Sequence, residues 1–224
     1  MSDGRPLVLI VFLENVGHIQ GMDLPQWAMN AVDFVSEEYA KILLHLHGAH
    51  RRYDRVIILE DERATGPELA DALLSASRTH RVDLLLLVHG HEGCLVGYRA
   101  KKMVGAETFQ RLRNAYDQDS KALDLRMIYG LNCFGASLAS TWVGLGAEVV
   151  NGAVGVNWFP EPSLSVFLRN WLGGQPYSRA VRQSNRRANQ VWYRLLRSTP
   201  EDAHPWIISS RQIIFGHADI TISG

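Results

Sequence analysis

The chain has 224 residues, of which 46% are hydrophobic, and its 23 basic side chains balance 23 acidic ones. This length suits one large domain whose core needs no disulfide or metal to stabilise it. Two cysteines, Cys94 and Cys133, with no C-x-x-C pair exclude a multi-bridge secreted scaffold and a cysteine-based zinc site. The neutral balance provides no overall attraction to nucleic acid or to an anionic membrane.

Short apolar segments alternate with amphipathic ones, a pattern typical of helices packed on both faces of a mostly parallel sheet. It predicts a single three-layer (αβα), doubly wound α/β domain over residues 1–224, built on a six-stranded sheet. The predicted strands are Leu7–Leu13, Val56–Leu59, Val82–Val88, Leu125–Tyr129, Glu148–Val156 and a last one near Ile207–Phe215. The predicted helices are Pro25–Leu46, Pro67–Ala76, Gly105–Tyr116, Ser163–Leu172 and Tyr177–Leu196.

Two apolar regions could be mistaken for a targeting or membrane segment, but neither has the features of one. The first run ends at Glu14 without a cleavage site, so it indicates a buried strand. The uncharged stretch 127–147 contains four glycines and changes from strand-like to helix-like in its middle. We therefore expect a strand, a tight turn and a helix there. Together with the unpaired thiols, this favours a cytoplasmic protein without membrane contact.

Two of the predicted strands end in reactive residues. Val82–Val88 is followed by His89 and Gly90, and Leu125–Tyr129 leads to Cys133. Because the carboxyl ends of parallel strands meet at one edge of a sheet, we expect His89 and Cys133 to lie close together. A histidine within proton-transfer distance of a cysteine is what nucleophilic thiol catalysis requires. A helix expected to begin at Cys133 would favour its thiolate.

The motifs around these residues resemble those of the caspase-like (clan CD) cysteine peptidases, which include caspases, legumains, gingipains, separases and bacterial CHAT domains. His89-Gly-His-Glu-Gly93 is similar to the His-Gly-x-x-Gly that carries their catalytic histidine, and Asn132-Cys-Phe-Gly135 to their Ala-Cys-x-Gly. Cys94–Tyr98 resembles the hairpin strand that follows the histidine. The segments Gly146–Val150 and Ile213–Gly216 resemble CHAT-type endings.

The resemblance implies a caspase/hemoglobinase-like fold and a cysteine endopeptidase with a His-Cys dyad. Cys133 would attack the peptide carbonyl to form an acyl-enzyme, and His89 would transfer the proton. The backbone N–H groups of Gly90 and Cys133 would form the oxyanion hole, and no metal or other cofactor is implied. Substrate contacts are expected beside the cysteine and after the fifth strand, from Leu131, Asn132, Val156, Asn157 and Trp158.

Leu131 departs from the pattern of the family. Caspases carry Gln at this position, and relatives that cleave after Arg or Lys commonly carry Asp. Without a charge at this position, we expect an apolar or small side chain before the scissile bond.

A second interpretation is an α/β-hydrolase with a cysteine nucleophile. Its nucleophile elbow needs Gly two residues before the nucleophile, where this chain has Leu131. It also needs a late histidine, for which His204 and His217 are the candidates.

A third interpretation is a catalytically silent adaptor. The predicted helix Tyr177–Leu196 carries Arg179, Arg182 and Arg186 on one side and contains no acidic residue. This pattern fits either a solvated basic face or a docking surface for an acidic protein; nucleic acid is the less favoured partner, and a homodimer is a further arrangement to test.

The remaining thiol and histidines fit structural roles. Cys94 falls in an apolar hairpin strand, so we expect it to pack as a small hydrophobic residue. His45, His47 and His50 are clustered, but their offsets of two and five do not share a helical face, so we expect no metal site from them.

Overall fold

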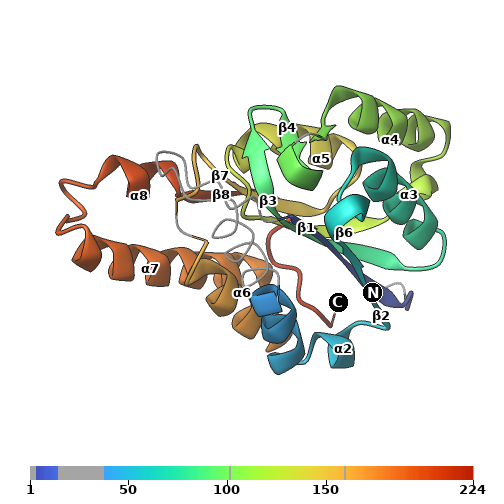
Figure 1. The fold of residues 1–224 in the computed structure, drawn as a ribbon. Coiled ribbons are helices and arrows are strands. Elements are labelled where there is room, and N and C mark those ends of the chain that lie inside the picture. The colour runs from blue at the N-terminus through green and yellow to red at the C-terminus, as the bar shows by residue number, and fades with distance from the viewer. Residues whose placement is uncertain (1–3, 15–37, 101, 159, 224) are drawn as a thin grey trace.

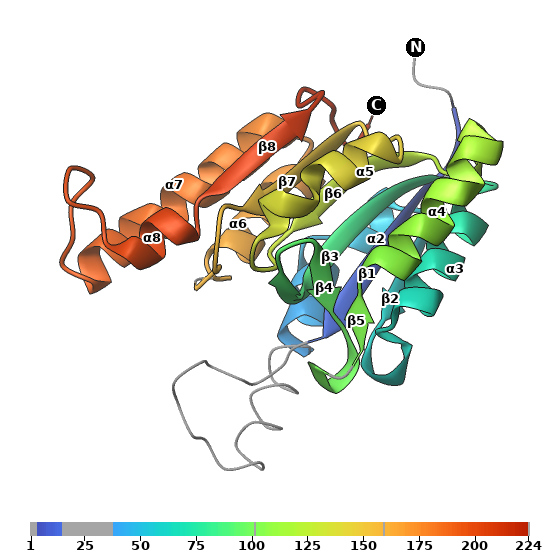
Figure 2. The same cartoon turned by 90° about the horizontal axis from the view of Figure 1, so that it is seen from above.

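The computed structural model describes residues 4–14, 38–100, 102–158 and 160–223. In this part of the chain a twisted sheet is flanked by helices on both faces (Figure 1 and Figure 2). Its main strands run in the order β2-β1-β3-β6-β7-β8, parallel except for the antiparallel pair β7 and β8. They are β1 (Leu7–Glu14), β2 (Arg55–Leu59), β3 (Arg81–His91), β6 (Leu125–Gly130), β7 (Val149–Ala153) and β8 (Gln212–Gly216).

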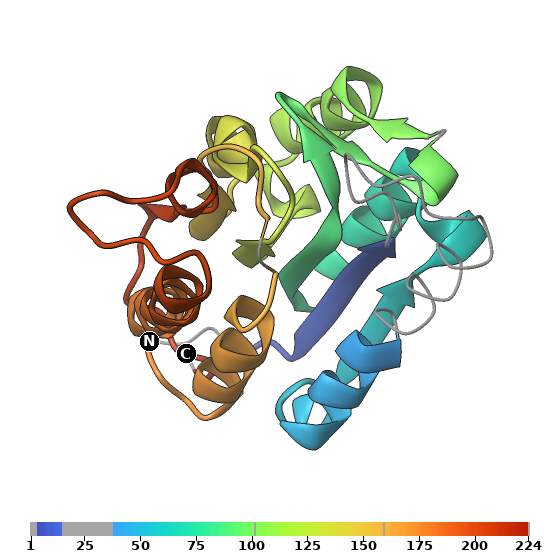
Figure 3. The same ribbon diagram turned by 60° about the vertical axis from the view of Figure 1, so that its left-hand side comes forward.

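The two faces of the sheet bury separate apolar clusters, because successive side chains along a strand point to opposite sides. Ile10 and Phe12 of β1 belong to one cluster, whereas Leu9 and Val11 belong to the other. Helices α3 (Gly66–Ser77), α4 (Ala106–Gln118) and α5 (Ala139–Gly144) cover the first face. Residues 38–46, α2 (Ala49–Arg52), α6 (Ser163–Leu172) and α7 (Tyr177–Leu195) cover the second (Figure 3).

A short hairpin extends from the carboxyl end of β3. Strand β4 (Cys94–Val96) folds back on β3 so that His89 pairs with Val96, and β5 (Met103–Val104) pairs in turn with β4. Short 3₁₀ turns complete the described part: η1 (Asp61–Arg63), η2 (Tyr98–Ala100), η3 (Ser120–Ala122) and η4 (Gly135–Leu138).

The predicted fold class is confirmed, and the main differences lie at the late strands. Ile207, predicted in the last strand, lies instead in the short helix α8 (Pro205–Ser209). Pro205 suits a first helical position, and the His204 side chain accepts a hydrogen bond from the N–H of Trp206, so a helix begins where strand was expected. The predicted fifth strand ends at Ala153 rather than Val156. Most of the predicted helix Pro25–Leu46 lies outside the described residues; 38–46 are helical.

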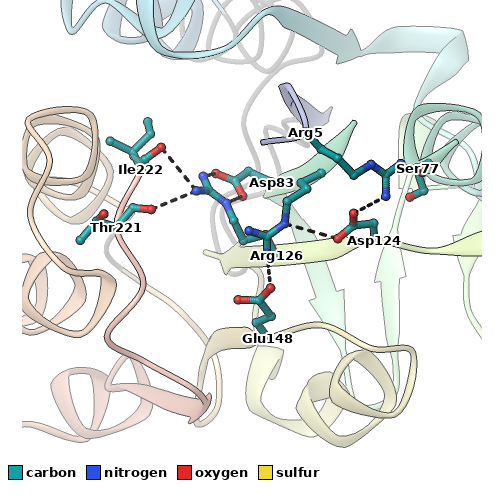
Figure 4. Close-up of polar contacts among 9 residues, drawn as sticks. Arg5, Ser77, Asp83, Asp124, Arg126, Glu148, Thr221 and Ile222 are labelled. Atoms are coloured by element: carbon teal, nitrogen blue, oxygen red, sulfur yellow. Dashed lines mark hydrogen bonds and ion pairs between the residues drawn. The ribbon is translucent and has the colours of Figure 1, made fainter. Parts of the chain in front are cut away.

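A buried ion pair lies near the beginnings of strands β3 and β6. It is therefore at the opposite end of these strands from the motifs that follow them. Arg126 of β6 is 1% exposed, and its Nε donates to a carboxylate oxygen of Asp83, itself 0% exposed, at 2.8 Å. The same guanidinium donates to the carbonyl oxygens of Thr221 and Ile222 (Figure 4). Arg126 therefore fastens the C-terminal segment to the sheet.

None of the helices in the described ranges is both long and apolar enough to cross a membrane.

Candidate active site

The two motif-bearing strands are neighbours in the sheet. Leu86 of β3 pairs with Gly130 of β6, and the N–H of Leu131 donates to the carbonyl of Leu86 at 3.0 Å. Because β3 and β6 are parallel, the segments that follow them emerge at the same edge. The residues from His89 onward and those around Cys133 therefore share one rim of the molecule.

Gly90 brings the two segments into direct contact. A Cβ atom added at this residue would lie 2.3 Å from the carbonyl oxygen of Cys133 and 3.0 Å from Nδ2 of Asn132. Only a glycine allows this approach without displacing the backbone. The contact places His89, the half-buried residue before Gly90, next to the segment that carries the cysteine.

The Cys133 thiol lies among backbone N–H groups. The N–H of Asn157 donates to Sγ at 3.4 Å, and the backbone N–H groups of Gly90 and of Cys133 itself also act to lower the pKa of the thiol. All three favour the thiolate, but burial of the half-buried side chain has the larger effect and raises the pKa of the Cys133 thiol. The resting thiol is therefore protonated at neutral pH.

The expected thiolate-stabilising helix does not begin at Cys133. Phe134 adopts a left-handed conformation with φ of 54°, and the chain then forms the 3₁₀ turn η4 before the six-residue helix α5. A short, irregular turn offers a weaker dipole than a regular helix. The expectation that a helix beginning at Cys133 favours the thiolate was therefore wrong, because no such helix begins there and burial of the sulfur raises the pKa of the thiol.

Two further contacts hold the histidine hairpin against the cysteine turn. The Ser137 hydroxyl accepts a hydrogen bond from the N–H of Gly93 at 2.9 Å and donates to the carbonyl of Phe134 at 2.7 Å. The rings of His91 and Phe134 are stacked, with centroids 6.1 Å apart. Sequence reasoning missed Ser137, because nothing in the local pattern shows which distant loop a hydroxyl group will meet.

Glycines also allow the cysteine turn to pack on β7. A Cβ at Gly152 would lie 2.2 Å from the carbonyl carbon of Gly135, and one at Gly135 would lie 2.9 Å from Cα of Gly152. The glycine two residues after Cys133 is thus explained by close packing of two backbones. Its φ is not in the left-handed region.

Asn157 links the loop after β7 to the cysteine segment through two groups. Besides its backbone contact with Sγ, its side-chain Nδ2 donates to the carbonyl of Leu131 at 2.7 Å. Leu131 itself is 7% exposed, and its side chain belongs to the core beside Tyr129. The structure therefore does not support a substrate contact by the Leu131 side chain. Asn132 is likewise buried, at 1% exposure, and its amide reaches the carbonyl of Cys133.

The remaining residues predicted to contact substrate, Val156 and Trp158, are half-buried, and hydrogen bonds hold them against the end of α8. The carbonyl of Val156 accepts a hydrogen bond from the Ser209 hydroxyl at 2.8 Å, and the N–H of Trp158 donates one to the Ser210 hydroxyl at 2.9 Å. Helix α8 therefore forms part of the rim around Cys133, which the sequence-based strand assignment did not predict.

Neither late histidine is placed as an α/β-hydrolase would need. His217 follows β8, and its N–H donates to the carbonyl of Glu148, just before β7 begins, so it lies at the edge of the sheet opposite Cys133. The His204 ring accepts a hydrogen bond from the backbone N–H of Trp206, and the same ring packs edge-on against the Trp206 indole. Its ring nitrogen serves as a helix cap, which leaves the hydrolase interpretation without a structural basis.

The arginines of α7 lie on its solvent side, whereas Ala180, Val181 and Ser184 face the core. Within the described ranges, none of the exposed α7 arginines forms a salt bridge with an acidic side chain. These arginines are Arg179, Arg182, Arg186, Arg187 and Arg194.

Comparisons with known proteins identify the fold. Neither a family model nor a curated protein matches the sequence. The structure is similar to the crystal structure of the Arg-specific cysteine proteinase gingipain R, with a TM-score of 0.63 and 12% identity over 97% of this chain and 47% of that one. A complex of the pro- and mature domains of RgpB from Porphyromonas gingivalis matches with a TM-score of 0.50 and 12% identity, over 84% of this chain and 43% of that one.

The chain thus spans about half the length of these two solved chains. At this level of identity the similarity concerns the fold alone. The chain has a caspase-like α/β fold.

Proposed function

We propose that this protein is a cysteine endopeptidase that hydrolyses peptide bonds with Cys133 as nucleophile and His89 as proton-transfer group. The observation that carries the proposal is that strand β3, which carries His89, lies against the turn with Cys133, whose sulfur accepts a hydrogen bond from the N–H of Asn157. The fold shared with gingipain R, a cysteine proteinase, supports it.

The raised pKa of Cys133 determines how the reaction begins. Because the resting thiol is protonated, His89 must accept its proton as the sulfur attacks the peptide carbonyl. The C–S bond forms, and negative charge moves onto the carbonyl oxygen, where the N–H groups of Gly90 and Cys133 stabilise it.

Collapse of this tetrahedral intermediate breaks the C–N bond. The protonated His89 gives its proton to the departing amine and leaves an acyl-enzyme, a thioester on Cys133. Water then attacks the thioester with His89 again accepting a proton, which releases the acid and restores the thiol. Every step uses residues of this chain, so the mechanism needs no cofactor.

Covalent labelling tests the proposal. A panel of peptidyl chloromethyl ketones should alkylate Cys133, located by mass spectrometry, and the rate should fall at least tenfold in His89→Ala because the general base is missing. Cys94→Ala is the matched control and should keep both labelling and peptide hydrolysis. Equal loss of hydrolysis in Cys133→Ala and Cys94→Ala, or hydrolysis that survives Cys133→Ala, would overturn the assignment.

We also propose that the exposed arginines of α7 bind an acidic protein partner. The stripe from Arg179 to Arg194 covers 16 residues, roughly 22 Å from the first to the last at the helical rise, and the segment 162–200 contains no acidic residue. The neutral balance of the whole chain argues against a nucleic-acid surface, because such surfaces normally accompany a basic domain.

A binding measurement with polyglutamate tests this surface. The triple variant Arg179→Gln/Arg182→Gln/Arg186→Gln should weaken binding at least tenfold, whereas Arg51→Gln/Arg52→Gln/Arg55→Gln, on exposed residues elsewhere, should change it little. Equal weakening in both variants would indicate nonspecific attraction. Tighter binding of an RNA duplex than of polyglutamate would replace the proposed partner class.

A further inference from the structure

We propose that Asn132 is a positioning residue of the reaction, whose buried side-chain amide holds the peptide group after Cys133 and thereby sets where the sulfur lies. The inference rests on the proposed peptidase function and adds a residue to its machinery. Asn132 is 1% exposed, so its side chain does not reach a substrate and acts through the neighbouring cysteine.

The amide of Asn132 lies in a cage formed by three glycines. An added Cβ atom would lie 3.0 Å from Nδ2 at Gly90, 2.7 Å from Oδ1 at Gly130 and 3.3 Å from Nδ2 at Gly135. Gly90 is near the end of β3, Gly130 ends β6, and Gly135 begins the turn η4. Asn132 therefore lies where the three segments around the cysteine meet, and a side chain at any of these glycines would press on its amide.

Stability alone does not explain an amide in this cage. Its Oδ1 is buried, and no group in the described part of the chain donates a hydrogen bond to it. A buried acceptor without a donor lowers the free energy of unfolding, whereas the alanine of the similar family motif would leave no polar atom unpaired. Departures of this kind from the rules of stability are expected at functional sites.

The other end of the amide contacts the backbone of the cysteine. Nδ2 donates to the carbonyl of Cys133 at 3.3 Å, and the N–H of Phe134, in the same peptide group, donates to the carbonyl of Gly155 at 2.7 Å. These two hydrogen bonds form a clamp that holds the peptide group at both of its polar ends. Because this peptide group is bonded to the Cα of Cys133, the clamp also limits how the sulfur can move.

The clamp maintains a backbone conformation that is unfavourable by itself. Phe134 has φ of 54°, in the left-handed region that residues other than glycine rarely adopt, so contacts around it must hold the turn in place. When the Asn132 hydrogen bond is lost, we expect the turn to shift and the sulfur to move relative to His89. A displacement of about 1 Å can lower a reaction rate about 100-fold.

Kinetics combined with urea unfolding tests this role. Asn132→Ala should lower kcat for peptide hydrolysis about tenfold or more and change KM less than about twofold, because the nucleophile is misplaced while the substrate-binding surface is intact. Its unfolding midpoint should change little, because the lost hydrogen bond is offset by removal of the unpaired acceptor. A raised KM together with a lower midpoint would indicate a structural role and overturn the inference.

Asn170→Ala is the matched control. Asn170 of α6 is also an asparagine with a buried amide atom that lacks a partner within the described ranges. Its replacement removes the same chemical group away from the cysteine turn. Both kcat and KM should therefore stay at the wild-type values.

Hydrogen exchange separates failure of this inference from failure of the proposed function. Followed by NMR, the amide proton of Phe134 should exchange about tenfold or more faster in Asn132→Ala than in the wild type, because one side of the clamp is gone. Unchanged exchange, or an unchanged kcat in Asn132→Ala when the wild type hydrolyses peptides, would overturn the positioning role while the peptidase assignment stands. Faster exchange in a protein that hydrolyses no peptide would support the clamp and overturn the peptidase.

Discussion

The Cα of Gly90 packs against the carbonyl group of Cys133, so closely that a Cβ atom at residue 90 would fall 2.3 Å from the carbonyl oxygen. This contact joins the end of strand β3 to the turn after β6. The N–H of Gly90 also acts to lower the pKa of the Cys133 thiol. The histidine strand and the cysteine turn therefore act as one unit, and their relative position depends on a missing side chain.

Replacing this glycine tests that dependence. Gly90→Ala should lower kcat/KM for peptide hydrolysis by about 100-fold or more, because the displaced backbone moves an oxyanion donor. Gly105→Ala is the matched control, since its Cβ would lie 3.4 Å from the nearest atom, an ordinary contact distance. Wild-type activity in folded Gly90→Ala would show that the close approach is not needed.

The raised pKa of Cys133 predicts a pH dependence. Alkylation of Cys133 by iodoacetamide should be slow at pH 7 and rise with pH to a midpoint above the ordinary pKa of a thiol, because burial disfavours the thiolate. Mass spectrometry can follow Cys133 separately from Cys94. A rate that is already constant from pH 5 to pH 8 would indicate a preformed thiolate and contradict general-base action by His89.

The raised pKa of Cys133 also makes the free energy of unfolding depend on pH. A thiol whose pKa is raised in the folded state contributes stability below its ordinary pKa, and this is lost as the pH rises through the folded value. The unfolding free energy of the wild type should therefore fall with rising alkaline pH relative to that of Cys133→Ala. Parallel curves in urea denaturation would contradict the shift.

Ser137 should act as a positioning residue. In Ser137→Ala the Gly93 N–H and the Phe134 carbonyl lose their hydroxyl partner, at a cost of about 1 kcal/mol in unfolding free energy. Because the histidine hairpin loosens, kcat should fall several-fold with KM little changed, and Ser137→Thr should restore part of it. Ser140→Ala, at an exposed position on α5, should alter neither quantity. A loss of stability with unchanged kcat would show that Ser137 has only a structural role.

The buried pair of Arg126 and Asp83 should affect the free energy of unfolding but not the rate of peptide hydrolysis by the folded protein. Arg126→Met leaves the Asp83 carboxylate buried without its cationic partner and should reduce the unfolding free energy by about 3–5 kcal/mol. The double variant Asp83→Leu/Arg126→Met should lose less than the sum of the two single variants, as urea denaturation can measure. Additive losses would show that the two charges are not coupled.

The apolar runs were sufficient to predict a mostly parallel sheet with both reactive segments at one rim. Runs such as Val82–Val88 have few alternative structures, and parallel strands bring their carboxyl ends to the same side of a sheet. That β3 and β6 are direct neighbours comes from the structure, because the sequence pattern does not determine strand order. The helices Ser163–Leu172 and Tyr177–Leu195 follow equally from apolar spacing.

Features that depend on contacts between distant segments could not be predicted in this way. Ile207 lies in an apolar stretch that suits a strand, but Pro205 and the His204 cap start a helix locally. The direction of the Cys133 pKa shift depends on how deeply neighbouring loops bury the sulfur, which no local pattern records. The stacking of Trp206 on Trp158 likewise depends on α8 packing beside the loop after β7.

Trapping the acyl-enzyme is the most direct test of the central claim, that Cys133 is a nucleophile served by His89. The protein is mixed with a peptide ester substrate, quenched in acid within the first turnovers and digested for mass spectrometry. The account predicts a thioester on Cys133, absent in Cys133→Ala and strongly reduced in His89→Ala, with Cys94 unmodified. Hydrolysis that proceeds with the acyl group on another residue, or with no acyl-enzyme in any variant, would contradict it.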